Sequence, residues 1–580
     1  MRTGEMFRIL VVDVESGSSQ SVSLAGRDDY VGGSGLAALL FSKYGNMSAD
    51  WSDPCQPLIF TVGPLTGLFP LMSKMVCSFR SSYHNEYTES HAGGRAALAL
   101  RFCGYDGLVI LGKAKRLCCL GVSSKKVQVK DSSFMRGLDA DSSGKLIRRM
   151  FPEGSGHRTI LRIGPSGELG SSMACINVDT YRHFGRMGGG AIMGAKNIKG
   201  IVIHGDCNFA APEGRDYAKL YHKMYQQVTS TDMMRKYHNL GTPANLQKLN
   251  DIEALPWNNL QKTSDSGISS ITGTKFAEET LLRNGACAGC PVGCIHIGYI
   301  REKMERDHRY HYHQVAYDYE PIFAAGTMLG ITNTFDILRI LELMEKSCID
   351  AMSAGVALAW ATEATEQGLI SDKETIIPLS FGDTQAFQQA AIYLGKGKND
   401  FYRLLGQGTL KAAKEYGGEE FACVLGQEMA GYATGELFYA AQTLGFRHSH
   451  LDTGAYGYEQ KNVDKDVNKA VDYLISDEPS RAFLTSMVCC LFARSVYTNE
   501  LLADCLHVMG FEQLANSIDE TSEFIRKVRW KTRIATGFNP DNLSIPKRFY
   551  SVRNWKGVVD KDYLQNLKKE YGKRILELAV

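Results

Sequence analysis

The chain has 580 residues, of which 44% are apolar and 22% are charged, and its formal net charge is +2. A chain of this length exceeds what one hydrophobic core normally serves, so we expect two or three packed domains. The balanced charge gives no reason to expect a nucleic-acid or membrane-surface partner, and no uncharged apolar window of about 18 residues predicts a membrane span.

The first 205 residues have the pattern of a β-rich region. Residues 7–14 (FRILVVDV) form an apolar strand with no signal-peptide pattern before it, so we expect a cytoplasmic protein. A turn at 15–17 and a second strand near 21–24 follow. Further apolar strands, bounded by glycine, lie at 57–67, 106–114 and 200–206. These runs predict an N-terminal two-sheet β domain with few helices.

After Asp206 the spacing of apolar residues becomes helical. It is clearest at 214–229, 335–368, 384–395 and 400–417. We therefore predict an α+β fold, in which the β-rich N-terminal domain is followed by two mainly helical domains. The predicted domains are residues 1–205, 206–400 and 401–580.

Four glycine-rich loops have the composition of anion-binding sites, because glycine lets backbone N–H groups converge and arginine adds a clamp. None matches a dinucleotide fingerprint or a Walker A loop. Each loop alone is equally well explained as a tight turn, but four in one chain favour a large phosphorylated cofactor. The loops are residues 31–35, 90–95, 182–190 and 350–355.

Three cysteines stand close together in the segment 287–294, CAGCPVGC. Cys287, Cys290 and Cys294 have the spacing C-x2-C-x3-C on a loop shaped by glycine and proline, so their thiolates can surround one face of an iron–sulfur cubane. Fifteen cysteines in a chain of this size do not indicate a disulfide scaffold. A structural zinc site or unliganded core cysteines are the alternatives, although no second cysteine knuckle completes the usual zinc pattern.

A [4Fe–4S] cluster usually takes four thiolates, so one more ligand must come from a distant segment. We predict Cys490 as this ligand, in the sequence TSMVCCL at 485–491, with the adjacent Cys489 as the competing candidate. An apolar helix with two ordinary buried cysteines is the alternative interpretation.

The motifs, taken in order, resemble those of the aldehyde:ferredoxin oxidoreductases, tungsten enzymes that carry a bis-pterin cofactor and one [4Fe–4S] cluster. The resemblance runs over nearly the whole chain. It rests on GPLTG at 63–67, SHAGG at 90–94, FCGYDGLVILGKA at 102–114, IGPSGE at 163–168, GRMGGGAIMGAKNIKGIV at 185–202, CAGCPVGC at 287–294, YEPIFAAGTMLGITN at 319–333, IDAMSAG at 349–355 and HSHLD at 448–452.

This resemblance implies a tungsten (or molybdenum) bis-pterin that lies on the N-terminal β domain and is covered by the helical domains. A Mg²⁺ ion that bridges the pterin phosphates is a further implication. On the β side, the implied contacts to pterin or phosphate are Lys74, His91, Gly93, Gly94, Arg182, His183, Gly185 and Arg186. On the helical side, they are Asp350, Thr485 and Cys489.

The resemblance also implies the reaction. We expect an oxidoreductase that oxidises an aldehyde to a carboxylic acid and passes electrons through the cluster to ferredoxin or a ferredoxin-like subunit, within a homodimer or a hetero-oligomer. One alternative runs the same cofactors as a low-potential reductase of a carboxylic acid or an aryl-CoA thioester. Another is an iron–sulfur electron-transfer subunit without substrate chemistry of its own.

Glu320 and His450 are the predicted acid–base residues, because both match positions that lie beside the metal in the family. Glu320 stands on the apolar stretch YEPIFAAG, where burial would raise its pKa. A helix-start glutamate near solvent is the alternative for Glu320, His448 competes with His450, and either histidine could be a core residue. For His308, His311 and His313, in RDHRYHYHQ, we expect an exposed polar loop rather than a metal site.

Overall fold

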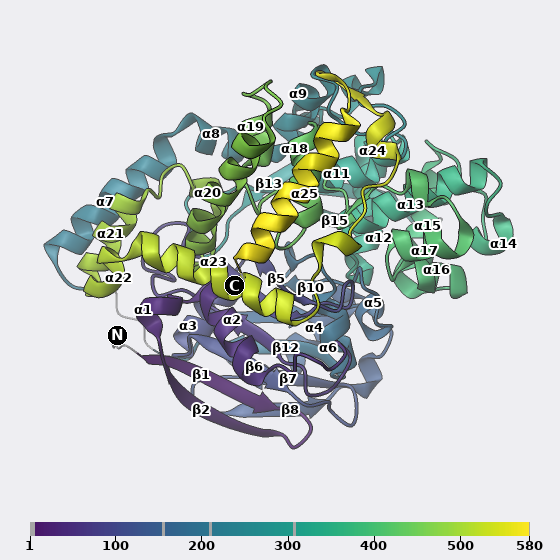
Figure 1. Ribbon diagram of the computed structural model, residues 1–580. Coiled ribbons are helices and arrows are strands. Elements are labelled where there is room, and N and C mark those ends of the chain that lie inside the picture. The colour runs from purple at the N-terminus through teal and green to yellow at the C-terminus, as the bar shows by residue number, and fades with distance from the viewer. Residues whose placement is uncertain (1–5, 154–156, 208–211, 305–308, 579–580) are drawn as a thin grey trace.

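The computed structural model describes residues 6–153, 157–207, 212–304 and 309–578. The N-terminal part contains two six-stranded sheets, and most of the remainder is helical (Figure 1). The predicted α+β fold, with a two-sheet β part followed by a mainly helical part, is therefore confirmed. The boundary near residue 400 stays a prediction. No helix in the described ranges has both the length and the apolar character that a membrane crossing requires.

The first sheet has the strand order β2-β1-β6-β3-β4-β5, in which β1 and β6 are parallel and the other neighbours antiparallel. The turn predicted at 15–17 joins its first two strands, and the apolar runs at 7–14, 57–67 and 106–114 supply β1, β3 and β6. Its strands are β1 (Met6–Asp13), β2 (Ser18–Ala25), β3 (Leu58–Thr61), β4 (Met75–Arg80), β5 (Tyr87–Ala92) and β6 (Gly107–Leu111).

The second sheet has the order β11-β10-β9-β12-β7-β8, and β7 and β12 are its parallel pair. Leu10 and Val12 of β1 share an apolar core with Ile201 of β12, whereas Ile9 belongs to the core on the other side of the first sheet. Burial on both faces explains the continuous apolar run at 7–14. The strands are β7 (Cys118–Val122), β8 (Val127–Asp131), β9 (Arg158–Arg162), β10 (Ile176–Val178), β11 (Arg182–Phe184) and β12 (Ile198–His204).

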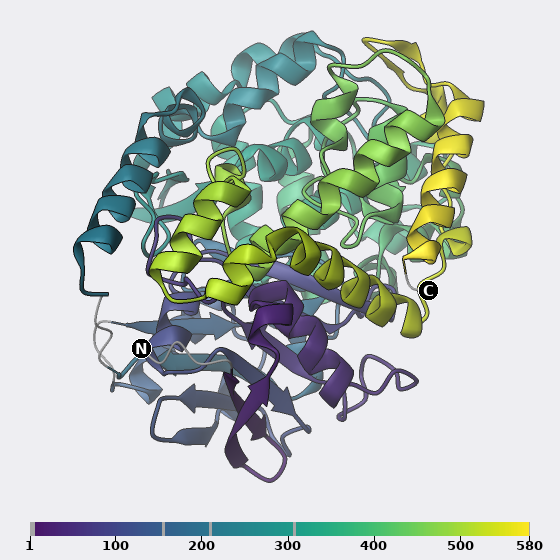
Figure 2. The same cartoon turned by 60° about the vertical axis from the view of Figure 1, so that its left-hand side comes forward.

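Helix α2 (Gly33–Tyr44) lies between the first sheet and the C-terminal helices α20 (Val467–Ser486) and α23 (Ile518–Ala535) (Figure 2). Gly33 has a φ of +35°, and a Cβ there would collide with the carbonyls of Thr485 and Ser486. The glycine-rich segment 31–35 is therefore where two distant parts of the chain approach each other closely.

The predicted helical run at 335–368 forms two helices, α12 (Thr334–Ser347) and α13 (Ala351–Glu366). Cys348 has a φ of +55° and ends the first helix in a left-handed residue. Asp350 begins the second, because its side chain accepts a hydrogen bond from the Ser353 N–H at 3.0 Å. The fourth glycine-rich loop is thus a helix cap followed by the first turn of α13.

Residues 281–317 contain a three-stranded antiparallel sheet that the sequence analysis did not predict. It consists of β13 (Leu281–Gly285), β14 (Ile295–Lys303) and β15 (Tyr310–Tyr317). The expectation of a polar loop is wrong for His311 and His313, which lie in β15, and His308 lies outside the described residues. Polar residues on both faces of this strand hide the alternation that normally reveals a strand.

A buried ion pair joins the first sheet to the C-terminal helices. Arg529 of α23 donates two hydrogen bonds to Glu89 of β5, at 3.0 and 3.2 Å. Burial alone would raise the pKa of Glu89, but the charge of Arg529 and the hydrogen bond from His91 hold the pKa below its ordinary value. The pair therefore keeps a carboxylate ionised in the interior.

Arg529→Met should destabilise the protein strongly, because it leaves the Glu89 charge buried without its partner. We expect a loss of about 3–5 kcal/mol in the free energy of unfolding, measured by denaturant titration. Lys531→Met, at an exposed position on the same helix, is the control and should change stability by less than about 0.5 kcal/mol. Equal stability of the two variants would contradict this role for the ion pair.

Candidate functional site

The three clustered cysteines lie on the loop that joins β13 to β14. Gly289 in this loop has a φ of +71°, a left-handed conformation that glycine adopts without strain. The loop contacts the second glycine-rich loop, where the Ala288 N–H donates to the Gly94 carbonyl at 3.0 Å. A Cβ on Gly93 would stand 2.5 Å from Cys287 Sγ, so a residue without a side chain is needed there.

Cys490 reaches the same place from the segment that follows α20. The Leu71 N–H donates to the Gly289 carbonyl at 3.3 Å, and the Leu71 carbonyl accepts from the Cys490 N–H at 3.0 Å. Close by, the Lys74 N–H donates to the Val488 carbonyl at 3.0 Å. The segment that begins at Leu71 therefore ties the two cysteine motifs to each other through backbone hydrogen bonds.

Lys74 is a half-buried cation among these thiols. Burial alone would lower the pKa of Lys74, but the charges of Cys490 and Cys287, with a smaller contribution from Cys294, raise it. Burial would likewise raise the pKa of Cys287, and the charges of Lys74 and Arg182 hold it below its ordinary value. Iron binds thiolates, so a fixed cation here favours the ionised form that a cluster needs.

The other two thiols of the loop lie in a more apolar setting. Burial raises the pKa of Cys290 to about 11 and that of Cys294 to about 12, so a metal must displace their protons. In the part of the chain that the structure describes, no three His, Cys, Asp or Glu side chains are placed to hold one metal ion. A cubane, unlike a single zinc ion, spreads its thiolates over several irons.

Cys489, the competitor of Cys490, lies in an apolar core with Cys505 and Tyr497. Burial raises the pKa of Cys489 well above its ordinary value. Thr485 in the same segment is buried too, and its Oγ1 lies 3.0 Å from Ser34 Oγ in the first glycine-rich loop. Both residues pack the interface between α20 and the β part.

Two of the glycine-rich loops meet at Arg186. Its guanidinium donates to Asp350 Oδ2 at 3.2 Å and to the Glu428 carbonyl at 2.6 Å. In the same loop, Arg182 Nη1 lies 3.3 Å from Asp318 Oδ2, while the buried Arg182 Nε is without a hydrogen-bond partner.

Gly185, three residues after Arg182, has open space where a side chain would be. An unpartnered, buried guanidinium nitrogen suits an anionic group such as a phosphate, and the same side chain also faces the Cys287 thiol. The residues of this loop therefore fit the phosphorylated cofactor that the sequence predicts.

His91 and His183 already have protein partners. His91 Nε2 lies 3.1 Å from Glu89 Oε2, and Nδ1 lies 3.1 Å from Arg447 Nη1. Burial and the charge of Arg447 lower the pKa of His91 to about 4, so its ring is neutral. His183 Nε2 lies 2.7 Å from Glu345 Oε2, although the geometry does not form a hydrogen bond. The contacts of His91 fix the loop that carries it.

Glu320 and His450 are brought together from distant parts of the helical region. His450 Nε2 lies 3.2 Å from Glu320 Oε1, and the Tyr432 hydroxyl donates to the same oxygen at 2.8 Å. Glu320 stands in the first turn of α11 (Tyr319–Ala325). Burial alone would raise the pKa of Glu320, but the hydrogen bond and charge of His450, with the Tyr432 hydroxyl, hold it below its ordinary value of 4.5. The raised pKa expected from the sequence is wrong, because specific partners outweigh burial.

The Glu320–His450 pair and the cysteine site are neighbours. Asp318 is the N-cap of α11, two residues before Glu320, and it also faces Arg182. Burial raises the pKa of Asp318, Arg182 opposes this shift, and the charge of Glu320 adds to it. One short segment therefore connects the loop that carries Arg182 to the Glu320–His450 pair.

His448 has a different environment from His450. Its Nδ1 lies 2.8 Å from the Thr443 carbonyl, and its Nε2 lies 2.7 Å from Arg533 Nη2. Burial and the charge of Arg533 lower the pKa of His448 well below its ordinary value. A neutral ring that donates to a carbonyl and accepts from an arginine is a fixed structural element, whereas His450 contacts Glu320.

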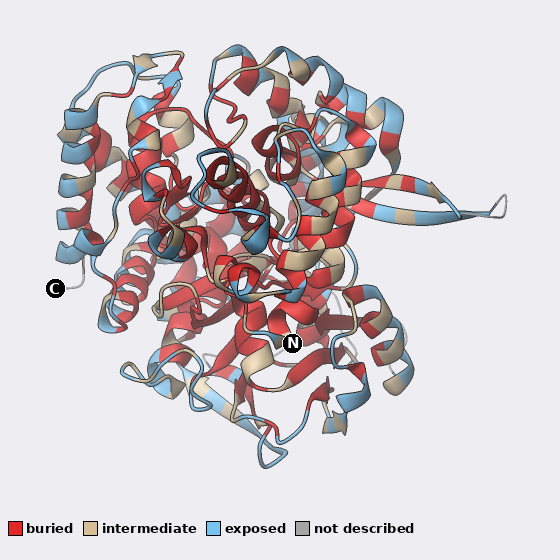
Figure 3. Cartoon of the chain, turned by 90° about the vertical axis from the view of Figure 1, so that its right-hand side faces the viewer, coloured by how far each residue is buried: buried red, intermediate tan, exposed pale blue. Residues whose placement is uncertain are grey.

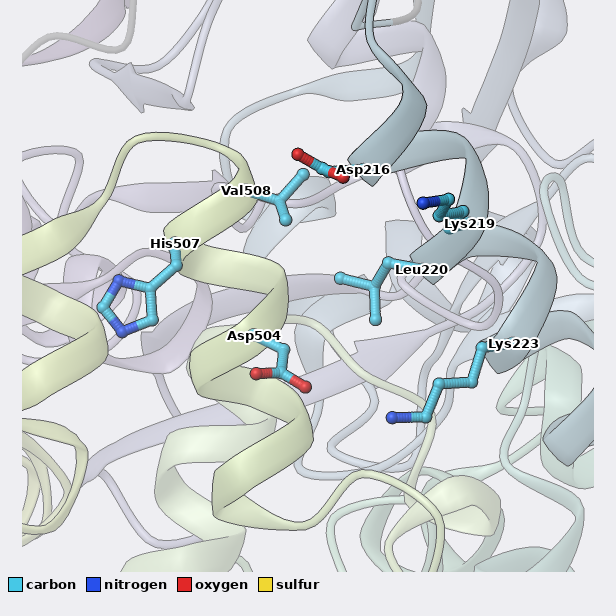
Figure 4. Close-up of a pocket in the computed structure, with 7 residues that line it drawn as sticks. All are labelled: Asp216, Lys219, Leu220, Lys223, Asp504, His507 and Val508. Atoms are coloured by element: carbon cyan, nitrogen blue, oxygen red, sulfur yellow. The ribbon is translucent and has the colours of Figure 1, made fainter.

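A separate hollow of about 330 Å³ lies on the surface between α7 (Arg215–Ser230) and α21 (Asn499–Val508), shown in Figure 4. Its lining mixes both charges with two apolar side chains and includes none of the predicted site residues. The lining residues are Asp216, Lys219, Leu220, Lys223, Asp504, His507 and Val508.

Two family models together match almost the whole chain. The model described as the N-terminal domain of aldehyde ferredoxin oxidoreductase matches residues 9–205, and the model of its domains 2 and 3 matches residues 219–574. The chain belongs to the aldehyde ferredoxin oxidoreductase family.

The relatives that match this chain are consistent with this family. The tungsten-containing aldehyde ferredoxin oxidoreductase of Pyrococcus furiosus is 26% identical over 90% of this chain and 87% of its own length. The WOR-like subunit of an aliphatic sulfonate oxidoreductase from the same organism is 26% identical over 87% and 80%. Among solved structures, the active-site complex of benzoyl coenzyme A reductase with 1,5-dienoyl-CoA has the same fold, with a TM-score of 0.80, 19% identity and coverage of 98% and 95%.

Three residues at the site of this aldehyde ferredoxin oxidoreductase family member were not predicted from its sequence. Tyr432 contacts Glu320, Arg447 bonds His91, and Asp318 faces Arg182. Asp318 carried a usable signal, since an aspartate directly before an apolar helix is a common cap. Tyr432 and Arg447 carried none, because their partners lie far away in the sequence.

Proposed function

We propose that this chain is a tungsten- or molybdenum-dependent oxidoreductase that oxidises an aldehyde to a carboxylic acid and passes the electrons through a [4Fe–4S] cluster to ferredoxin. The observation that carries the proposal is the meeting of two distant cysteine motifs, 287–294 and 489–490, around the half-buried Lys74. The family and its tungsten-containing relatives support the metal and the substrate class.

In this proposal, the cluster ligands are Cys287, Cys290, Cys294 and Cys490. The pterin cofactor would lie against Arg182 and Gly185 on the β side and near Asp350 on the helical side. When bound, its metal accepts the two electrons that leave the aldehyde. The chain contributes the binding surface, the orientation and the charges around it.

The oxidation of an aldehyde to an acid takes one oxygen atom from water and releases two electrons and two protons. Glu320 is ionised at neutral pH, because His450 and Tyr432 stabilise its carboxylate, so it serves as a base that accepts a proton. His450 Nε2, 3.2 Å from Glu320 Oε1, holds its own proton toward the carboxylate, so it orients and stabilises this base.

Tyr432→Phe should shift the acid limb of the pH–rate profile upward. The carboxylate of Glu320 is the active form, and it is lost as the pH falls through its pKa, which lies below 4.5 in the native protein. Removing the hydroxyl donor raises this pKa, so activity should be lost at a pH about one to two units higher. The pH dependence of kcat/KM measures the shift.

Tyr439→Phe is the matched control, because Tyr439 is a buried tyrosine whose hydroxyl has no hydrogen-bond partner. Its acid limb should match that of the native protein. A Tyr432→Phe profile that coincides with this control would show that Glu320 is not the titrating base.

The reductase alternative uses the same cofactors in the opposite direction, and the likeness to the benzoyl coenzyme A reductase complex, which shows the fold alone, does not favour it. Anaerobic assays with a viologen dye separate the two. Reduction of oxidised dye by aldehydes supports the proposal. Oxidation of reduced dye by aryl-CoA thioesters, with no aldehyde-dependent reduction, would replace it.

A further inference from the structure

The sheet formed by β13, β14 and β15 has one packed face, and its other face points outward from Tyr299 toward the hairpin tip, while Ile295 and Ile297 on that face are buried. Ile300, Val315 and Tyr317 belong to the main helical core, and α12 covers this side of the sheet. Because side chains alternate along a strand, Tyr299 and Arg301 of β14 lie on the opposite face. Figure 3 shows β14 and β15 projecting beyond the rest of the chain, with mostly exposed residues toward their tip.

The outward face is aromatic. Tyr310 and Tyr312 of β15 are 44% and 51% exposed, and as residues two apart on one strand they lie side by side on this face. Tyr312 stacks on Tyr299 with ring centroids 5.5 Å apart, and the Arg301 guanidinium lies 3.7 Å from the Tyr310 ring. These contacts fix the side chains in place without covering them, as in a preformed binding surface.

The outward face is also positive. Arg283 of β13 and Arg301 and Lys303 of β14 all lie on it, as the strand register places them. Glu302, the one carboxylate in the described residues of these strands, is on the opposite face, where it pairs with Arg339 at 2.9 Å. Within the described part of the sheet, the outward face therefore combines three cations with tyrosines and carries no carboxylate.

The loop 286–294 joins β13 to β14 at one end of this face, and the buried Ile295 and Ile297 separate it from the exposed residues. Tyr299 follows the first residue of β14 by four positions, which places it roughly 13 Å along the strand from the end of the loop. Lys303, at the far end of β14, lies roughly 26 Å from the loop, so a partner that also covers Tyr299 and Arg283 would hold its redox centre near the cysteines.

We propose that the outward face of β13, β14 and β15 is the docking surface for a small acidic iron–sulfur protein that exchanges electrons with this chain. The proposal rests on the proposed function, because it takes the cysteine site as a cluster site. Charge complementarity selects the partner: three cations attract an acidic surface and steer its approach. Exposed tyrosine and arginine are the residue types that dominate binding energy at interfaces. A second copy of this chain would bring the same cations to the contact.

The test compares two electron acceptors for the anaerobically purified holoenzyme with an aldehyde substrate. One is a purified small acidic [4Fe–4S] ferredoxin, and the other is a viologen dye, which needs no docking surface. Arg301→Glu combined with Lys303→Glu should raise the half-saturating ferredoxin concentration about tenfold or more at low salt and leave the viologen rate unchanged. Tyr312→Ser, which changes no charge, should raise it as well.

Lys125→Glu combined with Lys569→Glu is the matched control, with the same charge change at exposed positions away from this sheet. The control should behave like the native enzyme. A double variant at 301 and 303 that also matches the native enzyme overturns the proposal. Conversion of a native dimer into a monomer by that variant, seen by light scattering, overturns it too, because the face would then bind a copy of the chain.

Failure of the proposed function would be visible separately, as a native enzyme that reduces neither acceptor with any aldehyde. Docking is then measured by calorimetry, as the binding of the same ferredoxin to the native protein and to both double variants. Binding that only the 301 and 303 variant loses supports the docking surface. Binding that all three proteins share, or that none shows, overturns it.

Discussion

Replacing Cys490 with alanine should remove most of the iron from the anaerobically purified protein. A [4Fe–4S] cluster is held by four thiolates, and in our assignment Cys490 is the ligand that the loop 287–294 cannot supply. The native protein should contain about four iron atoms per chain from this cluster. The variant should lose the brown colour and the electron transfer to ferredoxin, as measured by iron and sulfide analysis and by absorbance.

Cys489→Ala is a demanding control, because it removes the neighbouring sulfur from a buried position. Cys489 lies in the apolar core with Cys505 and Tyr497, so its loss should cost some stability but leave the iron content intact. The reverse pattern, with iron lost from Cys489→Ala and kept in Cys490→Ala, would exchange the two roles. Full iron content in both variants would remove this segment from the cluster site.

Replacing Glu320 with glutamine should lower kcat by about 10²–10⁴-fold while the metal and iron contents stay at native levels. Glutamine keeps the shape of the side chain but cannot accept a proton, so the loss reports the proton transfer itself. The ionised carboxylate also holds His450 in place, at 3.2 Å, and this support weakens in the variant.

His448→Gln separates the two histidines of the HSHLD motif. His448 is bonded to Thr443 and Arg533, so its replacement should lower stability and retain a measurable kcat in the folded fraction. His450→Gln should instead follow Glu320→Gln in kcat. Near-native turnover of both Glu320→Gln and His450→Gln would end the assignment of this pair as the acid–base group.

Features that depend on neighbouring residues could be predicted from the sequence. The strand at 7–14 was recognisable because both of its faces are buried, and the cysteine triplet because its spacing is local. The loop at 182–190 was recognisable because glycines and arginines follow each other directly. The family resemblance added residues that no local pattern indicates, such as His450.

Features that depend on distant contacts could not be predicted. The position of Cys490 is set by the backbone of Leu71, and the pKa of Glu320 is set by His450 and Tyr432, which lie far away in the chain. The strand β15 was missed because its exposed tyrosines and histidines lie on both faces. Neither the two-residue period of a strand nor the 3.6-residue period of a helix therefore stands out. The same exposed tyrosines are what suggests a docking surface there.

The most direct test of the account is elemental analysis of the protein purified without oxygen. The account predicts about four iron atoms, equivalent sulfide and one tungsten or molybdenum atom per chain. Iron without either heavy metal would contradict the proposed substrate chemistry and leave an electron-transfer protein. A colourless protein with neither iron nor a heavy metal would contradict the account as a whole.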